Sequence, residues 1–182
     1  MKIAFLMLAI ITCVYCVGSQ VISARAGLVR KVDGDVFIHC HEDTAKKSKL
    51  QIGDILHNED LVVSSESASV VLALNPGSHL FLYGATTLRV KDTALESMHF
   101  DIIVGEVIAK ISELENGASL LLHPPPARVE ILKKGLFRVF VQGGGETQVN
   151  VVTGEVMYND QSSRPTRLKK GRQVDFVRRS PQ

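Results

Sequence analysis

The stretch SVVLALNPGSHLFLYGATTLRV, residues 69–90, contains short apolar runs separated by residues that favour turns. The runs 69–74, 79–83 and 87–90 are rich in Val and Leu, and Asn75-Pro76-Gly77 lies between the first two. Short runs of aliphatic residues bounded by Gly, Pro and Asn are typical of β-strands joined by turns. This stretch therefore predicts strands rather than a helix.

The same pattern continues on both sides of this stretch, from Gly27 to residue 177. Alternation is clear in TQVNVV (147–152), where Val149 and Val151 share one face, and in FRVFV (137–141). Further runs lie at 28–32, 35–39, 60–64, 100–104, 106–111, 119–123, 128–132, 155–158 and 173–177. Only 110–115 could instead form a short helix. We predict an all-β domain, either a two-layer β-sandwich or a short β-helical wrap, built from about a dozen short strands.

The composition fits one ordinary globular domain. The chain has 182 residues, of which 45% are apolar and 5% aromatic, and it contains no Trp. This length is sufficient for a single proper core. The formal net charge of +2 argues against a dedicated nucleic-acid binder, because such domains carry strong basic patches.

The N-terminus differs from the rest of the chain. Met1-Lys2 precedes fifteen uncharged residues, IAFLMLAIITCVYCV (3–17). A short basic start and an apolar run of this length are typical of a signal peptide, and a membrane span needs roughly 20 residues. We predict a signal peptide over 1–19, with cleavage as late as 26, and a periplasmic or secreted protein. An uncleaved N-terminal anchor is the alternative, and the residues before Cys13 and Cys16 match a lipoprotein signal poorly.

Cleavage of that signal would remove Cys13 and Cys16 and leave Cys40 as the remaining cysteine. An intrachain disulfide could then not form, so stability would come from the core. At the other end, 164–179 holds seven Lys/Arg against one Asp. We expect a solvated basic face ending in a basic tail over 178–182, and membrane contact through this tail or the N-terminus stays open.

Three consecutive prolines, Pro124-Pro125-Pro126, end the run at 119–123. Prolines cannot donate to a β-ladder and favour an extended conformation. We expect them to form a stiff connector between two sheets or two layers. A polyproline ligand for a partner is the alternative.

The order of these signals resembles the FecR domain family across residues 27–177. The matching pieces include LQIGD (50–54), the run 70–74, Pro76-Gly77-Ser78, IVGEVIAKI (103–111), HPPPARVEILKKGLFRVFV (123–141), TQVNVVTGEV (147–156) and LKKGRQVDF (168–176). No single piece is diagnostic, because each combines a turn glycine with alternation. One departure is Lys134-Gly135-Leu136, where the family often has Arg-Gly-Thr, so a function tied to that threonine is in doubt.

The resemblance implies a periplasmic all-β module. The namesake proteins relay siderophore-receptor occupancy to a sigma factor through a cytoplasmic segment and one membrane helix. Here only 1–26 precede the matching region, so we do not expect the sigma-regulating activity. The resemblance leaves an exported binding or scaffold module that contacts a protein or a cell-envelope polymer.

The densest group of metal-ligand residue types is FIHCHED (37–43). His39 and His41 are two apart and would share a strand face, as in cupin metal sites. However, Glu42 follows without the cupin gap. Val36 and Ile38 would face the core, followed by Cys40, while Phe37, His39 and His41 face solvent. We therefore predict exposed histidines and a buried cysteine, and assign no metal, catalytic or cofactor residue.

No G-x-S-x-G, P-loop, C-x-x-C or H-E-x-x-H motif is present. We accordingly predict a non-enzymatic, exported FecR-like binding or scaffold module without a cofactor. The alternative is a cupin-like metal-binding protein or metalloenzyme that uses His39 and His41. A third hypothesis is a surface-attached structural protein, held by the N-terminus or the basic tail. The ligand and the oligomeric state do not follow from the sequence.

Overall fold

The computed structural model describes residues 25–40, 47–114, 118–160 and 164–177, and every regular element in these ranges is a β-strand. The predicted signal peptide, the terminal basic residues 178–182 and the segment from His41 to Asp43 lie outside the described residues. The described part of the chain contains no helix that is long and apolar enough to cross a membrane.

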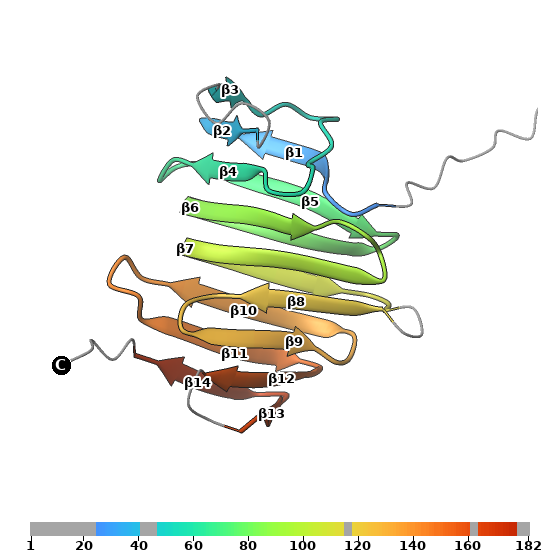
Figure 1. Cartoon of the computed structure of the whole chain (residues 1–182), viewed down its shortest axis with the longest axis vertical. Coiled ribbons are helices and arrows are strands. Elements are labelled where there is room, and N and C mark those ends of the chain that lie inside the picture. Colours follow the sequence, from blue (N-terminus) through green and yellow to red (C-terminus); the bar gives the residue numbers. More distant parts are fainter. Residues whose placement is uncertain (1–24, 41–46, 115–117, 161–163, 178–182) are drawn as a thin grey trace, which may run out of the picture.

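The strands form one mixed, branched sheet that folds into two layers, which agrees with the predicted all-β class (Figure 1). They are β1 (Leu28–Asp33), β2 (Val36–His39), β3 (Lys47–Lys49), β4 (Leu61–Ser64), β5 (Ser69–Asn75), β6 (Ser78–Asp92), β7 (Ser97–Ile111), β8 (Ser119–His123), β9 (Ala127–Ile131), β10 (Gly135–Val141), β11 (Thr147–Thr153), β12 (Glu155–Asp160), β13 (Thr166–Lys169) and β14 (Arg172–Phe176).

The two layers share β6 and β7. The front layer, nearer the viewer in Figure 1, has the order β3-β2-β4-β6-β7-β8-β9-β12-β13. The back layer has the order β1-β5-β6-β7-β10-β11-β14. Among the pairings between described strands, β7 with β8 is parallel and the others are antiparallel.

The sequence predicted separate strands at 79–83 and 87–90, and again at 100–104 and 106–111. The structure corrects this, because each pair is one strand of 15 residues that bends from one layer into the other. The first half of β6 pairs with β5 and its second half with β4, while β7 pairs with β8 and then with β10. Strands that switch sheets through bulges are a recognised way to turn a corner.

Hydrogen bonds between side chains and backbone hold this corner together. The Thr86 hydroxyl donates to Tyr83 O at 2.6 Å and accepts from the Glu106 N–H at 3.0 Å, so it joins β6 to β7. The Ser64 hydroxyl of β4 donates to Gly84 O at 2.6 Å and accepts from the Thr86 N–H at 3.2 Å. Both hydroxyls satisfy backbone groups that the interrupted ladder leaves unpaired.

Gly105 is the point of closest approach at the corner. It has a φ of +103°, and a Cβ there would lie 2.3 Å from Thr86 Oγ1 and 2.5 Å from Thr86 Cα. No side chain fits at these distances, so glycine is required both for its backbone conformation and for space.

The apolar faces of the two layers meet to form one core. Val149 and Val151 of β11, and Phe137, Val139 and Val141 of β10, are at most 1% exposed, which confirms the alternation predicted for both segments. In the front layer the largest buried side chains include Leu88, Met98, Phe100, Ile102 and Leu120. With Val36 and Ile38 also buried, the early strand β2 faces the core as its sequence predicts.

The triple proline has a different role from the predicted one. It closes the antiparallel pair β8–β9 within the front layer instead of connecting two layers. The Ala127 N–H donates to Pro124 O at 2.8 Å, and the Pro125-Pro126 peptide bond is cis, as in a type VI turn. Pro124 is buried in this turn, which does not fit the alternative of an extended polyproline ligand.

Two further features of the strands were missed or left open by the sequence. β3 (Lys47–Lys49) was not predicted, because its three polar, exposed residues carry no apolar signal and pair with β2 at the sheet edge. The segment considered for a helix begins inside β7, which continues to Ile111, and residues 112–114 are not helical.

Glu155 is a buried acid near the end of the molecule that carries β12 and β13. Its side chain is 7% exposed, and its two oxygens lie 2.8 Å from Lys133 Nζ and 3.2 Å from Arg167 Nη1. The hydrogen bond from Lys133 is the main cause that lowers the pKa of Glu155, and burial opposes it. The ionised carboxylate therefore links β12, β13 and the segment after β9.

We expect Gly105→Ala to destabilise the fold by about 2–5 kcal/mol, through the left-handed backbone strain and the clash with Thr86. Urea unfolding would measure the change. Gly143→Ala is the matched control, because a Cβ there meets no heavy atom within 4 Å. Equal unfolding midpoints for the two variants would contradict the assigned role of the corner.

We expect Glu155→Gln to lower the free energy of unfolding at neutral pH but not in acid. Because folding lowers the pKa of Glu155 below the ordinary 4.5, its contribution is complete above that value and disappears as pH falls through the folded-state value. Urea unfolding from about pH 7 to pH 3 would show the two stability curves converging in acid. Glu66→Gln, at an exposed position, should follow the wild-type curve; a constant Glu155→Gln deficit at every pH would argue against this ion-pair role.

Candidate functional site

The parallel pairing of β7 with β8 brings together side chains that are far apart in sequence. Its register places Asp101 opposite His123 and His99 opposite Leu121. Since residues two apart on a strand share a face, His99 and Asp101 both point to the outer side of the front layer. His123, at the end of β8, then lies beside them.

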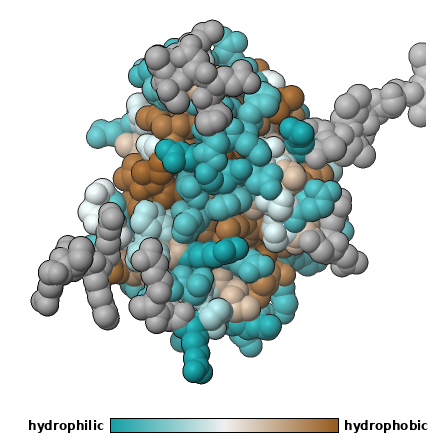
Figure 2. Space-filling view, viewed as in Figure 1, coloured by the Kyte–Doolittle hydropathy of each residue, from teal (hydrophilic) through white to brown (hydrophobic). Residues whose placement is uncertain are grey.

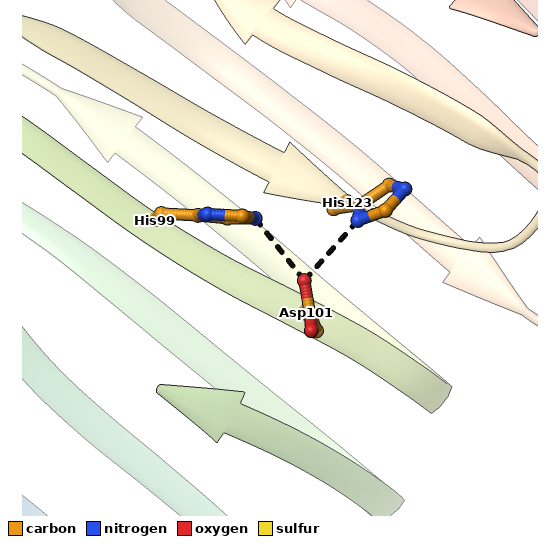
Figure 3. Close-up of side chains that lie close together, drawn as sticks. All are labelled: His99, Asp101 and His123. Carbon is orange, nitrogen blue, oxygen red and sulfur yellow. Dashed lines mark hydrogen bonds and ion pairs between the residues drawn. The ribbon is translucent and has the colours of Figure 1, made fainter. Parts of the chain in front are cut away.

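The three side chains converge on one carboxylate oxygen (Figure 3). Asp101 Oδ1 lies 3.1 Å from His99 Nε2 and 3.2 Å from His123 Nδ1. The two imidazole rings are tilted by 44°, with centroids 6.0 Å apart. One nitrogen from each ring and one carboxylate oxygen all lie within 4.8 Å of one another, so the cluster could hold a metal ion.

The environment of the cluster is asymmetric. The side chain of His123 is 50% exposed, whereas that of His99 is 28% exposed. Burial is the main cause that lowers the pKa of His99; the charge of Asp101 opposes this, and His123 and Arg128 add to it. Nε2 of His99 is buried and makes no hydrogen bond of acceptable geometry, although it lies close to Asp101.

The histidine singled out by the sequence lies on the same outer face but away from this cluster. Across the sheet, His39 pairs with Leu61, Leu61 with Arg89, and Arg89 with Asp101. Three strand spacings of 4.7–4.9 Å separate His39 from Asp101, roughly 14 Å in all. His39 therefore cannot share a metal with His99 and His123, and its predicted partner His41 lies outside the described residues.

The structure places Cys40 at intermediate exposure, packed against the core. It is thus less buried than the sequence predicted. Phe37 lies on the outer face, where Lys47 Nζ stacks 3.8 Å from its ring centroid. No described residue near His39 completes a metal-binding group, since His99, Asp101 and His123 are the group found among the described residues.

Little in the sequence indicates this cluster. His99-x-Asp101 has strand spacing, but such pairs are common on solvated faces. His123 comes 22 positions after Asp101 and becomes its neighbour only through the parallel pairing of β7 and β8. Pairing between distant strands does not follow from local periodicity.

The back layer has a different kind of outer surface. His79, Phe81 and Tyr83 point outward in a row along β6, with ring centroids 6.1 and 6.4 Å apart, and Phe81 and Tyr83 are stacked at 8°. The register places Val71 and Ile108 on either side of Phe81. We call this surface the aromatic face: Val71, His79, Phe81, Tyr83, Ile108 and Phe140.

Charged pairs flank the aromatic face. Arg138 Nε contacts Glu106 Oε1 at 2.6 Å, and Arg138 Nη1 donates to Gln148 at 3.2 Å. Lys31 and Asp33 form an exposed ion pair at 2.5 Å at the β1 edge. An aromatic and aliphatic centre with a charged rim, including an arginine, is the common composition of a protein-binding surface.

The outer face of the front layer is more polar. Figure 2 shows hydrophilic residues running across its middle, with smaller hydrophobic areas beside them. This face carries the His99–Asp101–His123 cluster. The two candidate surfaces therefore lie on opposite sides of the sandwich.

Comparisons with known proteins bear on the fold. No family model matches the sequence, and no curated protein matches it. The structure is similar to two crystal structures of a "putative anti-sigma factor" from Parabacteroides distasonis, at 19% and 18% identity and a TM-score of 0.56 in each case. Each match covers 64% of this chain and 54% of the other, so the chain spans about half the length of these neighbours. At this identity the similarity shows a shared all-β fold.

Proposed function

We propose that this chain is an exported, non-enzymatic module of the FecR type, which binds a protein partner through its aromatic face. The similar structures are described as a "putative anti-sigma factor", a description that names no enzymatic activity, and this supports the proposal. The observation that carries it is the aromatic face itself, with its apolar centre and charged rim.

The glycines in the FecR-like pieces have structural roles that support the resemblance. Gly105, from IVGEVIAKI, permits the corner between the layers. Gly135 and Gly154 come from two other pieces and lie against each other: a Cβ on Gly135 would be 2.1 Å from Thr153 O and 2.9 Å from Gly154 Cα. At these positions glycine is required because a segment distant in sequence packs closely against the backbone. Such glycines are stronger support for a family resemblance than glycines that only form turns.

The departure at Lys134-Gly135-Leu136 has a local explanation. The Leu136 N–H donates a hydrogen bond to Thr153 Oγ1 at 3.0 Å. A threonine hydroxyl is therefore present at this turn, supplied from β11. The turn can keep its geometry without a threonine at position 136.

A protein partner suits the aromatic face better than the other ligand classes. Phe81 and Tyr83 offer rigid apolar area, and Arg138 is held in place by Glu106 and Gln148. Such pre-ordered aromatic and arginine side chains lose little entropy on binding. The mixed charges of the rim do not resemble the basic stripe that a nucleic acid requires.

Photo-crosslinking tests the proposed face. We expect p-benzoylphenylalanine in place of Phe81 to give one discrete protein adduct in source cells, which mass spectrometry would identify. The same probe in place of Glu130, on the outer side of the front layer, is the matched control and should give none. An adduct from position 130 but not 81, or an adduct to polysaccharide or lipid alone, would contradict the proposal.

Export needs its own test, since the proposed partner lies outside the cytoplasm. We expect cell fractionation to find the protein beyond the inner membrane, and Edman or mass-spectrometric N-terminal sequencing to begin between residues 20 and 27. An intact N-terminus in the membrane fraction would favour the anchored alternative. A cytoplasmic protein would overturn the proposed localisation.

A further inference from the structure

We propose that His99, Asp101 and His123 form a binding site for one divalent transition-metal ion, with Zn²⁺ as the best fit. The site is independent of the proposed partner-binding surface, because it lies on the outer side of the opposite layer. Its donors would be His99 Nε2, Asp101 Oδ1 and His123 Nδ1 (Figure 3).

The separations between the donor atoms match such an ion. Zn–N and Zn–O bonds of about 2.0–2.1 Å at tetrahedral angles place two ligand atoms about 3.3 Å apart. The two nitrogen-to-oxygen distances here are 3.1 and 3.2 Å, and all three donor atoms lie within 4.8 Å of one another. Small movements of the exposed His123 side chain would complete the geometry.

The unsatisfied nitrogen of His99 is the second observation. Buried polar atoms nearly always have a hydrogen-bond partner, so an exception calls for an explanation such as an ion. Nε2 of His99 is buried, has no such partner and points at Asp101. A cation between these two atoms would satisfy both.

The donor set also selects the class of metal. Two imidazoles and one carboxylate suit Zn²⁺, Cu²⁺ or Ni²⁺, whereas Ca²⁺ and Mg²⁺ prefer oxygen ligands. Burial lowers the pKa of His99, which favours the neutral imidazole that a metal ion binds. Asp101 supplies one negative charge to the site. The positive charge of Arg128 also acts on His99, and its repulsion of a cation limits the affinity for a metal ion.

The half-exposed position of His123 leaves room for a fourth ligand. We assign this position to solvent water, as in zinc sites that have three protein ligands. The competing interpretation is a simple hydrogen-bonded His–Asp–His group, in which His123 Nδ1 donates to Asp101 and no ion binds. The two interpretations differ in whether metal binds with one-to-one stoichiometry.

Calorimetric titration of the chelator-stripped, purified chain with Zn²⁺ distinguishes them. We expect saturable binding of one ion per chain, weakened at least about tenfold in His123→Gln and in Asp101→Asn. His123→Gln is the main variant, because its exposed side chain contributes little to folding. Mg²⁺ at the same concentrations should give no binding.

His39→Gln and His79→Gln are the matched controls. His39 lies on the same outer face roughly 14 Å away, and His79 lies on the back layer. Both variants should bind as the wild type does. Binding that is absent, that is unchanged in His123→Gln, or that is lost in His39→Gln would overturn the proposal.

Discussion

The contact between Gly105 and Thr86 is the constraint on which the architecture depends. At this point two 15-residue strands pass from one layer of the sandwich to the other, and their backbones approach too closely for a side chain at position 105. The Thr86 hydroxyl spans the gap and replaces ladder hydrogen bonds that the bend removes. Without this corner the front and back layers would be one long sheet with an unprotected apolar face.

The corner also determines which residues of β7 face outward. Met98, Phe100 and Ile102 are buried before it, whereas Val107, Ala109 and Ile111 are buried after it. The alternation therefore changes phase by one residue at the bend, as a bulge requires. As a result, odd-numbered residues of β7 form the histidine cluster on the front layer, and even-numbered residues contribute to the aromatic face on the back layer.

Local periodicity predicted the all-β class and the buried faces of β10 and β11, because a half-buried strand shows its pattern in a few residues. It divided β6 and β7 wrongly, since Gly84 and Gly105 look like turns when they are in fact corners within a strand. It also missed the cluster of His99, Asp101 and His123, which depends on a parallel pairing across 22 positions. His39 was prominent only because its neighbours in the sequence include other potential ligands.

The edges of both layers favour recognition through a face rather than by strand addition. Strands at sheet edges can pair with other chains, and natural proteins commonly protect them with lysine or other charges. Here each described edge strand carries such residues: Arg30 and Lys31 on β1, Lys47 and Lys49 on β3, Arg167 and Lys169 on β13, and Arg172 on β14. The basic C-terminal region thus supplies two protected edges. Among the described residues, the charged edge strands therefore leave the outer faces of the two layers, including the aromatic face, as the surfaces open to recognition.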